Sequence, residues 1–85
     1  MGEEVVGKVV DYFGKIGVAG IQVTAGSLSV GDTIRIKGHT TDVTQVVESI
    51  QLEHQGVQRA EPGQTIGIRV KERVRKGDSV LKVTP

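Results

Sequence analysis

Residues 29–42, which read SVGDTIRIKGHTTD, indicate the fold more directly than any other part of the chain. The stretch has a glycine at its third position, then alternates between aliphatic and polar residues, and ends in small polar residues. Alternation places Ile34 and Ile36 on one face and Arg35 and Lys37 on the other, as a half-buried β-strand requires. The stretch therefore predicts a turn, then a strand, then a tight connection.

The same alternation recurs at residues 65–70, TIGIRV, and the chain has twelve glycines and many valines and isoleucines. These features predict an all-β chain with six strands, at about 4–12, 17–25, 32–38, 42–54, 64–71 and 79–84. Glycines around 14–17 should join the first two strands as a hairpin. The long fourth strand changes phase between Val47 and Ile50, which predicts a bulge or bend near Glu48 and Ser49.

Three phrases, VGDTIRI, PGQTIGI and KGDSVLK, each place a glycine and a polar residue ahead of a strand. We interpret them as repeated turns and not as phosphate loops, because no helix follows. Their glycines, Gly31, Gly63 and Gly77, should adopt backbone conformations that other residues avoid.

A chain of 85 residues predicts one domain, here 1–85 with a core of about 5–83. Six short strands cannot form two well-stacked sheets, and closing one sheet removes its exposed edges. The expected architecture is therefore a small closed six-stranded β-barrel.

Composition excludes several classes of protein. The chain has no cysteine, no apolar run long enough to cross a bilayer, and an acidic start where a secretory signal needs basic residues. We therefore expect a cytoplasmic protein with no membrane partner. The nucleoside-triphosphate motif Gly-x-x-x-x-Gly-Lys-[Ser/Thr] is absent, so we expect no binding of a nucleoside triphosphate and no GTPase activity.

Catalytic chemistry has little support. The two histidines, His39 and His54, could hold a metal with Asp42 or Glu53 only if the fold joined distant strands, and zinc catalysis usually needs three protein ligands. The serines show no local base with an orienting partner. We expect no catalytic residue, no cofactor and no metal, and keep a small metal-dependent hydrolase as the weakest alternative.

The small residues of 38–42 suit a tight connection in which threonine and aspartate side chains bind nearby backbone amides, and we prefer this to a ligand site. Tyr12 and Phe13 are the only aromatic residues. Alternation should bury one and expose the other, so single-stranded RNA would find at most one stacking surface.

The net charge of +1 conceals an uneven distribution. Residues 1–65 hold five Lys or Arg against eight Asp or Glu, whereas residues 66–85 hold six against two. A basic segment of this kind attracts phosphate, although charged runs often serve only to solvate a surface.

Five stretches together resemble a known family: VGKVVDYF, GSLSVGDTIRIKG, VVESIQLEH, AEPGQTIGIRV and VRKGDSVLKV. Their order over about residues 5–83 is similar to the second domain of translational GTPases, the β-barrel of elongation factor Tu. The phrases KIGVA and IKGHTTD resemble more closely small stand-alone elongation-factor-like proteins and the barrel appended to collagenase-like peptidase-family proteins, some of which are implicated in RNA modification.

In elongation factor Tu this barrel helps to hold the 3′ aminoacyl end of tRNA. The resemblance implies that the equivalent pocket here involves Gln51, Glu53, His54, Thr65 and Gly67, with Gln51 where the family has a glutamate.

Our leading hypothesis is a non-catalytic, translation-factor-like module that contacts tRNA, ribosomal RNA or a ribonucleoprotein, with no DNA partner. Besides the pocket, the candidate phosphate contacts are Arg35, Lys37, Arg69, Lys71, Arg73, Arg75 and Lys76. The alternative is a protein-interaction barrel that docks a partner enzyme of the collagenase-like peptidase family. The scarcity of aromatic residues and the near-neutral charge favour this alternative.

Overall fold

The computed structural model describes residues 2–84, so both ends of the predicted domain, residues 1 and 85, lie outside the described residues. The described chain is all-β and contains no helix, which confirms the fold class. Its ten strands are β1 (Gly2–Phe13), β2 (Val18–Val23), β3 (Leu28–Ser29), β4 (Thr33–Lys37), β5 (Asp42–Val46), β6 (Ile50–Leu52), β7 (Gln55–Val57), β8 (Arg59–Ala60), β9 (Thr65–Arg69) and β10 (Ser79–Thr84).

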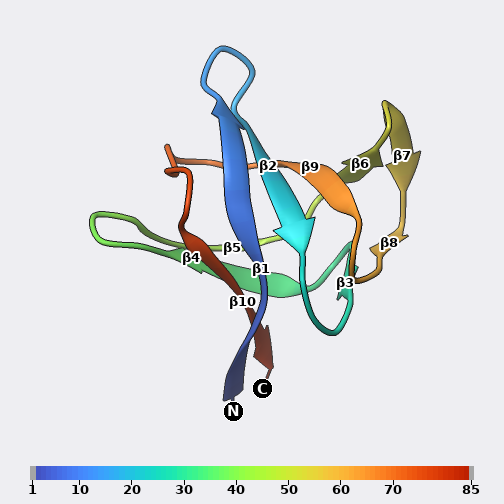
Figure 1. Ribbon diagram of the computed structural model, residues 1–85, viewed down its shortest axis with the longest axis horizontal. Helices are drawn as coiled ribbons and strands as arrows, with labels where there is room; N and C mark the ends of the chain where they lie inside the picture. The colour runs from blue at the N-terminus through green and yellow to red at the C-terminus, as the bar shows by residue number, and fades with distance from the viewer. Residues whose placement is uncertain (1, 85) are drawn as a thin grey trace.

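Eight of these strands form one antiparallel sheet in the order β5-β4-β10-β1-β2-β9-β6-β7, and β3 pairs with β8 in a separate ribbon. The long β1 lies in the middle and pairs with β10 along its first half and with β2 along its second half. The predicted hairpin between the first two strands is present, with Gly17 at a φ of 66°. Figure 1 shows that the sheet is strongly curved and that the two ends of the chain lie side by side, at the start of β1 and the end of β10.

The predicted fourth strand is divided into β5 and β6 by residues 47–49, where the bend was expected. These two strands lie near opposite ends of the sheet order but are consecutive in the chain. The pairing itself gives an eight-stranded sheet whose end strands, β5 and β7, do not pair with each other among residues 2–84. Hydrogen bonding between strands therefore does not close the six-stranded ring that the sequence predicts.

One side chain connects β5, at one end of the curved sheet, to the end of β9. The amide nitrogen of Gln45, on β5, donates to the carbonyl oxygen of Arg69 at 2.8 Å, and the backbone N–H of Lys71 donates to the Gln45 amide oxygen at 3.0 Å. Gln45 thus satisfies two backbone groups where a neighbouring strand would otherwise do so.

The sequence analysis missed β3, β7 and β8. Each is two or three residues long, which is too short to show alternation. In addition, β7 follows β6 through Glu53 and His54, which are not the glycine or asparagine that usually marks a two-residue turn.

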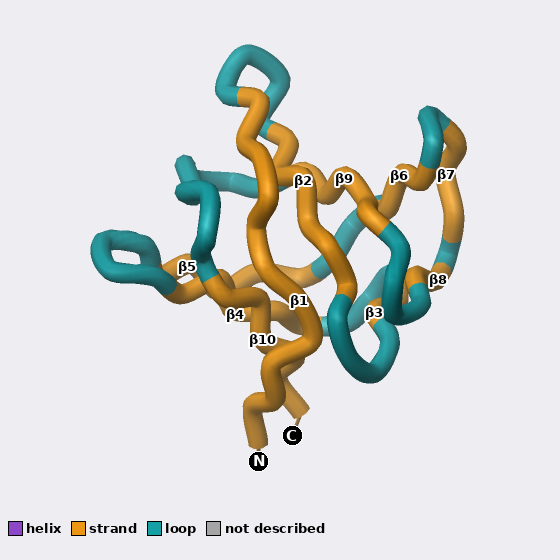
Figure 2. Tube along the Cα trace, in the orientation of Figure 1, coloured by secondary structure: helices purple, strands orange, loops and turns teal. Residues whose placement is uncertain are grey.

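The core is entirely aliphatic. Seventeen buried residues form one cluster, each at most 6% exposed, and Tyr12 packs against it from the edge. Phe13 is 49% exposed, so the expected division between the two aromatic residues is confirmed. Figure 2 shows that the strands surround this interior while the loops lie outside it. Close packing of the core directs the search for a site to the surface hollows.

The three recurring phrases adopt the same turn. At residues 29–32, the backbone N–H of Ser29 donates to the Asp32 carboxylate at 2.8 Å and Asp32 N–H donates to the Ser29 carbonyl at 3.0 Å. The equivalent bond from a backbone N–H to the side chain three residues later is also 2.8 Å from Glu61 to Gln64 and from Arg75 to Asp78. The intervening glycines have positive φ angles, which confirms the prediction and fits a type II turn: Gly31 (97°), Gly63 (93°) and Gly77 (95°).

The last of these turns contacts the hairpin between β4 and β5. Asp78 is 6% exposed, and its carboxylate lies so close to Gly38 that a Cβ at that position would overlap it. The residues Lys37 and Ser79 are also directly opposite each other in the sheet. This close approach holds the β4–β5 and β9–β10 loops side by side.

Substituting Gly38→Ala should therefore lower the free energy of unfolding by about 1–3 kcal/mol, because Asp78 must move or lose its turn hydrogen bond. Chemical denaturation with urea measures the change. Gly56→Ala is the matched control, since a Cβ there meets nothing within 4 Å. Equal stability of the two variants would contradict the close approach.

Candidate nucleic-acid interface

An open groove of about 550 Å³ lies on the outer surface between the β1–β2 hairpin and the β6–β7 turn. Two apolar side chains that line it are unusually exposed: Phe13 at 49% and Ile16 at 64%. The whole lining consists of Val10, Asp11, Phe13, Ile16, Val18, Gly20, Gln51, Glu53, His54, Thr65, Ile66 and Gly67.

The floor of the groove is formed by one row of residues across four strands. Asp11 of β1 is opposite Gly20 of β2, Gly20 is opposite Gly67 of β9, and Gly67 is opposite Gln51 of β6. Residues opposite each other across strands point to the same face of a sheet. Two adjacent glycines in the middle of the row leave backbone where side chains would stand, and this absence creates the depression.

The far wall of the groove has a strained backbone. Glu53 and His54 have φ angles of 50° and 66°, the left-handed region that non-glycine residues seldom occupy. Each such residue costs roughly 1 kcal/mol or more unless its surroundings enforce it, and such positions concentrate at functional sites. The turn directs two exposed polar side chains to the groove.

The groove continues along the surface. A hollow of about 250 Å³ shares Val18, Gln51 and Gly67 with it, and also contains Glu48 and Arg69. A further hollow of about 530 Å³ shares Glu48 and Arg69 and adds Lys71. The three together form a track that begins beside apolar and acidic side chains and ends beside two cations and Glu48.

The predicted site residues fall into three groups. All five residues of the implied pocket, Gln51, Glu53, His54, Thr65 and Gly67, line the groove. Arg69 and Lys71 line the continuation of the track. The remaining cations lie elsewhere: Arg35 and Lys37 on β4, and Arg73, Arg75 and Lys76 in the connection from β9 to β10. Sequence analysis did not predict that Phe13 and Ile16 form an apolar wall. An aliphatic residue at the tip of a hairpin, here Ile16, could have indicated it.

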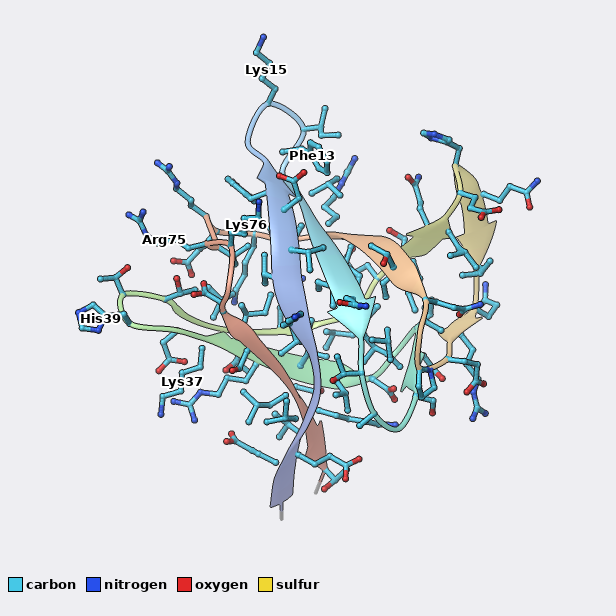
Figure 3. The ribbon with its side chains drawn as sticks, in the orientation of Figure 1. Phe13, Lys15, Lys37, His39, Arg75 and Lys76 are labelled. Carbon is cyan, nitrogen blue, oxygen red and sulfur yellow. The ribbon has the colours of Figure 1, made fainter. Side chains whose placement is uncertain are left out.

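Three loops combine at one end of the sheet to form a cationic rim, which we define as Lys15, Lys37, Lys71, Arg73, Arg75 and Lys76. The β1–β2 loop joins the β9–β10 connection through a hydrogen bond of 2.8 Å from Val70 N–H to the Gly17 carbonyl. The contact of Gly38 with Asp78 brings in the β4–β5 loop. Figure 3 shows Lys15, Lys37, Arg75 and Lys76 extending outward from these loops.

The rim carries uncompensated charge. Four ion pairs occur among residues 2–84, and they involve Arg35, Arg59 and Lys82 but no rim cation. Of the carboxylates in the rim loops, Asp78 is buried in its turn and Asp42 pairs with Arg35, which leaves Glu72 as one exposed acid among six cations. The near-neutral total charge therefore hides a positive end next to the groove.

The histidines are far apart in the sheet. His39 is exposed in the β4–β5 loop and His54 is exposed in the β6–β7 turn, and β5 and β7 are the two ends of the sheet. Over residues 2–84, no three or more His, Cys, Asp or Glu side chains gather in a way that could hold a metal ion. The structure thus offers no geometric support for the metal-dependent hydrolase.

Comparison with known protein families identifies the fold. The family model for elongation factor Tu domain 2 matches residues 17–81, which is most of the chain. The chain belongs to the elongation factor Tu domain 2 family. The resemblance to this family that the sequence analysis inferred is therefore confirmed.

The curated relatives that this chain matches are much longer proteins. A collagenase of Porphyromonas gingivalis is 46% identical over 78 residues, which cover 91% of this chain and 22% of that protein. An uncharacterized protease of Methanocaldococcus jannaschii is 41% identical over 76 residues, covering 88% of this chain and 18% of that protein. The chain thus spans about a fifth of the length of these curated relatives.

Among solved structures, the C-terminal domain of a Geobacillus thermoleovorans protein assigned to the U32 peptidases superposes with a TM-score of 0.88. It is 26% identical, and the match covers 95% of this chain and 93% of that domain. The resemblance to the appended barrel of collagenase-like peptidases is therefore confirmed. Between residues 2 and 84, this domain 2 protein has no helix of the length and apolar character that crossing a membrane would require.

Arg35, which the sequence suggested as a phosphate contact, already has carboxylate partners in this domain 2 protein. Its Nε and Nη2 donate to the two Asp42 oxygens, both at 2.8 Å, and its Nη1 donates to Glu3 at 3.2 Å. Asp42 therefore binds a guanidinium and not the backbone amide that we expected from the sequence. Hydrogen bonding to Asp42, then to Glu3, raises the pKa of Arg35, and the Arg35 hydrogen bonds lower the pKa of Asp42.

This lowered pKa predicts an acid-dependent stability. A carboxylate whose folded pKa lies below its usual value of about 4 stabilises the fold above that pH, and the effect disappears as pH falls through the folded pKa. Asp42→Asn should therefore lower the melting temperature at pH 6 but not at the acid end of the range. Thermal unfolding from about pH 2.5 to 7 measures this, with Glu72→Gln as an exposed control outside the four ion pairs. A pH-independent difference would contradict it.

Proposed function

We propose that this domain 2 protein is a non-catalytic, cytoplasmic binding module that contacts RNA. In this proposal the groove holds an unpaired strand end, and the cationic rim binds phosphates of the same molecule. The observation that carries it is the direct connection of the groove to cations, along the track to Arg69 and Lys71 and through the Val70–Gly17 hydrogen bond.

The groove suits a nucleobase better than a phosphate. Asp11 and Glu53 are acidic, whereas Phe13 presents an exposed ring and Ile16 an exposed aliphatic surface. A base can stack on such a ring without sequence preference. Gln51 offers both a donor and an acceptor to a base edge or a ribose hydroxyl, which is a broader pairing capacity than that of the family's glutamate.

The track suits the strand that follows the base. Phosphates repel carboxylates, so a strand end seated beside Phe13 would extend away from Asp11 and Glu53 and toward Arg69 and Lys71. The rim then supplies contacts that carry no sequence information but strengthen binding. Arg35 is outside this arrangement because its guanidinium already pairs with Glu3 and Asp42.

The proposal also needs a rigid support, and here we propose that the curved sheet behaves as a closed barrel. The bend at 47–49 carries the chain from β5 to β6, and Gln45 joins β5 to the backbone beyond β9. The end strand β5 is thereby linked to β9, two strands from the opposite end of the sheet, beside the track. A fixed frame lets surface residues hold a ligand at low entropic cost.

Removing rim charge should weaken RNA binding and reduce its dependence on salt. For Arg73→Ala, Arg75→Ala and Lys76→Ala combined, we expect the slope of log K against log salt to become shallower by about 2–3, because each phosphate contact contributes nearly one unit. Fluorescence anisotropy with a labelled RNA hairpin at several salt concentrations measures the slope. Arg59→Ala is the control, since Arg59 is an exposed cation paired with Glu61 on β8, outside the rim. An unchanged slope for the triple variant would remove the nucleic-acid proposal.

The groove is tested separately with Phe13→Ala. We expect at least about fivefold weaker binding to a hairpin with an unpaired 3′ end, because stacking on an aromatic ring is worth roughly 1–3 kcal/mol per base. Binding to a blunt hairpin should change little, because it has no free base to stack. Val5→Ala, at a similarly exposed position that lines neither the groove nor the track, is the control. The same loss for both RNAs would rule out an end-binding groove.

A further inference from the structure

The second exposed surface of the sheet is the outer side of β1, β10, β4 and β5, which we name the flat face. Val5 is opposite Leu81, Leu81 is opposite Arg35, and Arg35 is opposite Thr44. A second row, two residues further along each strand, consists of Glu3, Val83, Thr33 and Val46. Because residues opposite each other share a face, both rows point away from the core.

The flat face is more apolar than the water-facing side of an antiparallel sheet normally is. Val5 is 53% exposed and Val46 is 50% exposed, at the two sides of the face. Leu81 and Val83 lie between them on β10 and are only partly covered. Four aliphatic side chains on one open face mark an interaction surface more often than a solvated one.

The charge near the centre of the flat face is paired, whereas Lys8 and Lys37 lie in a neighbouring row of the same face, joined through Ser79. Arg35 stands near its centre and binds Asp42 on one side and Glu3 on the other, with the three residues on three different strands. Covering a paired arginine costs less than covering a lone charge, since its hydrogen bonds are retained. A paired arginine among apolar side chains suits the central part of a protein interface, whereas lysine is depleted there, so Lys8 and Lys37 would lie at the edge of the contact.

We propose that the flat face docks against the body of a peptidase-type protein, the kind of polypeptide that carries this barrel in its relatives. The curated relatives are about five times as long as the matched segment, and the matching solved structure is a C-terminal domain. In a protein whose C-terminal domain is this barrel, the rest of the polypeptide connects to the start of the strand equivalent to β1. Here β1 contributes Glu3 and Val5 to the flat face, so the connected protein body would lie next to this face.

Docking in this way leaves the RNA surfaces free. The groove lies over β2, β9 and β6, whereas the flat face lies over β10, β4 and β5, and only β1 contributes to both. The barrel would then be an adaptor with one side on an enzyme body and the other open. This inference does not rest on RNA binding, because no flat-face residue lines the groove and Val46 alone borders the last hollow of the track.

The test uses a chimera of the Porphyromonas gingivalis collagenase in which this chain replaces the matching 78 residues. Hydroxyl-radical footprinting with mass spectrometry compares side-chain oxidation in the chimera and in the isolated chain. We expect oxidation of Val5, Val46, Leu81 and Val83 to fall at least about threefold in the chimera, while Phe13 and Ile16 oxidise as before. Unchanged oxidation of the flat face, or protection of Phe13 in its place, would overturn the proposal.

A variant separates docking from folding. Val5→Gln together with Val46→Gln changes two half-exposed side chains without adding charge, so the isolated chain should keep its melting temperature. In the chimera, the protection of Leu81 and Val83 should be lost. Ile16→Gln, in the groove, is the matched control and should leave that protection intact. Retained protection in the double variant, or protection that already exists in the isolated chain through self-association, would contradict an enzyme body as the partner.

Discussion

Every surface of this protein depends on the packing of small aliphatic side chains into a core that contains no aromatic ring. Seventeen such residues fill the interior, and the alternation along each strand places their neighbours outside. A core packed in this way leaves no internal cavity of ligand size. Recognition is therefore confined to the outer faces of the sheet and to its loops, where side chains are not needed for packing.

Glycine then determines how that outer surface is shaped. Where Gly20 and Gly67 face each other, missing side chains create a groove in a sheet that would otherwise be smooth. Where Gly38 meets the Asp78 carboxylate, the missing side chain lets two loops approach and gathers their cations. The same residue type thus forms both parts of the proposed RNA surface, by leaving space in one place and permitting contact in the other.

The distribution of charge divides the molecule functionally. Arg35 on the flat face, Arg59 on β8 and Lys82 on β10 have carboxylate partners, whereas the cations of the cationic rim have none among residues 2–84. Paired charges favour contact with a protein surface, and unpaired cations favour contact with phosphate. The two proposals therefore concern different sides of one small fold, and each can fail without the other.

Much of the fold could be read from short-range patterns. Alternation located the six main strands, the phase change near Glu48 and Ser49 located the bend, and the repeated glycine phrases located three equivalent turns. Strands of two or three residues were missed because periodicity needs more positions to show. The left-handed turn at Glu53 and His54 was missed because neither residue type indicates it.

The sequence by itself determined which residues face inward and where the chain turns, because both depend on neighbours within a few positions. Only the tertiary structure decided which outward residues meet. Asp11, Gly20, Gly67 and Gln51 come from four strands and share one row only because of the order in which the sheet pairs. For the same reason Arg35, which looks like a free cation in the sequence, is held by Glu3, a residue 32 positions away on a strand two places across the sheet.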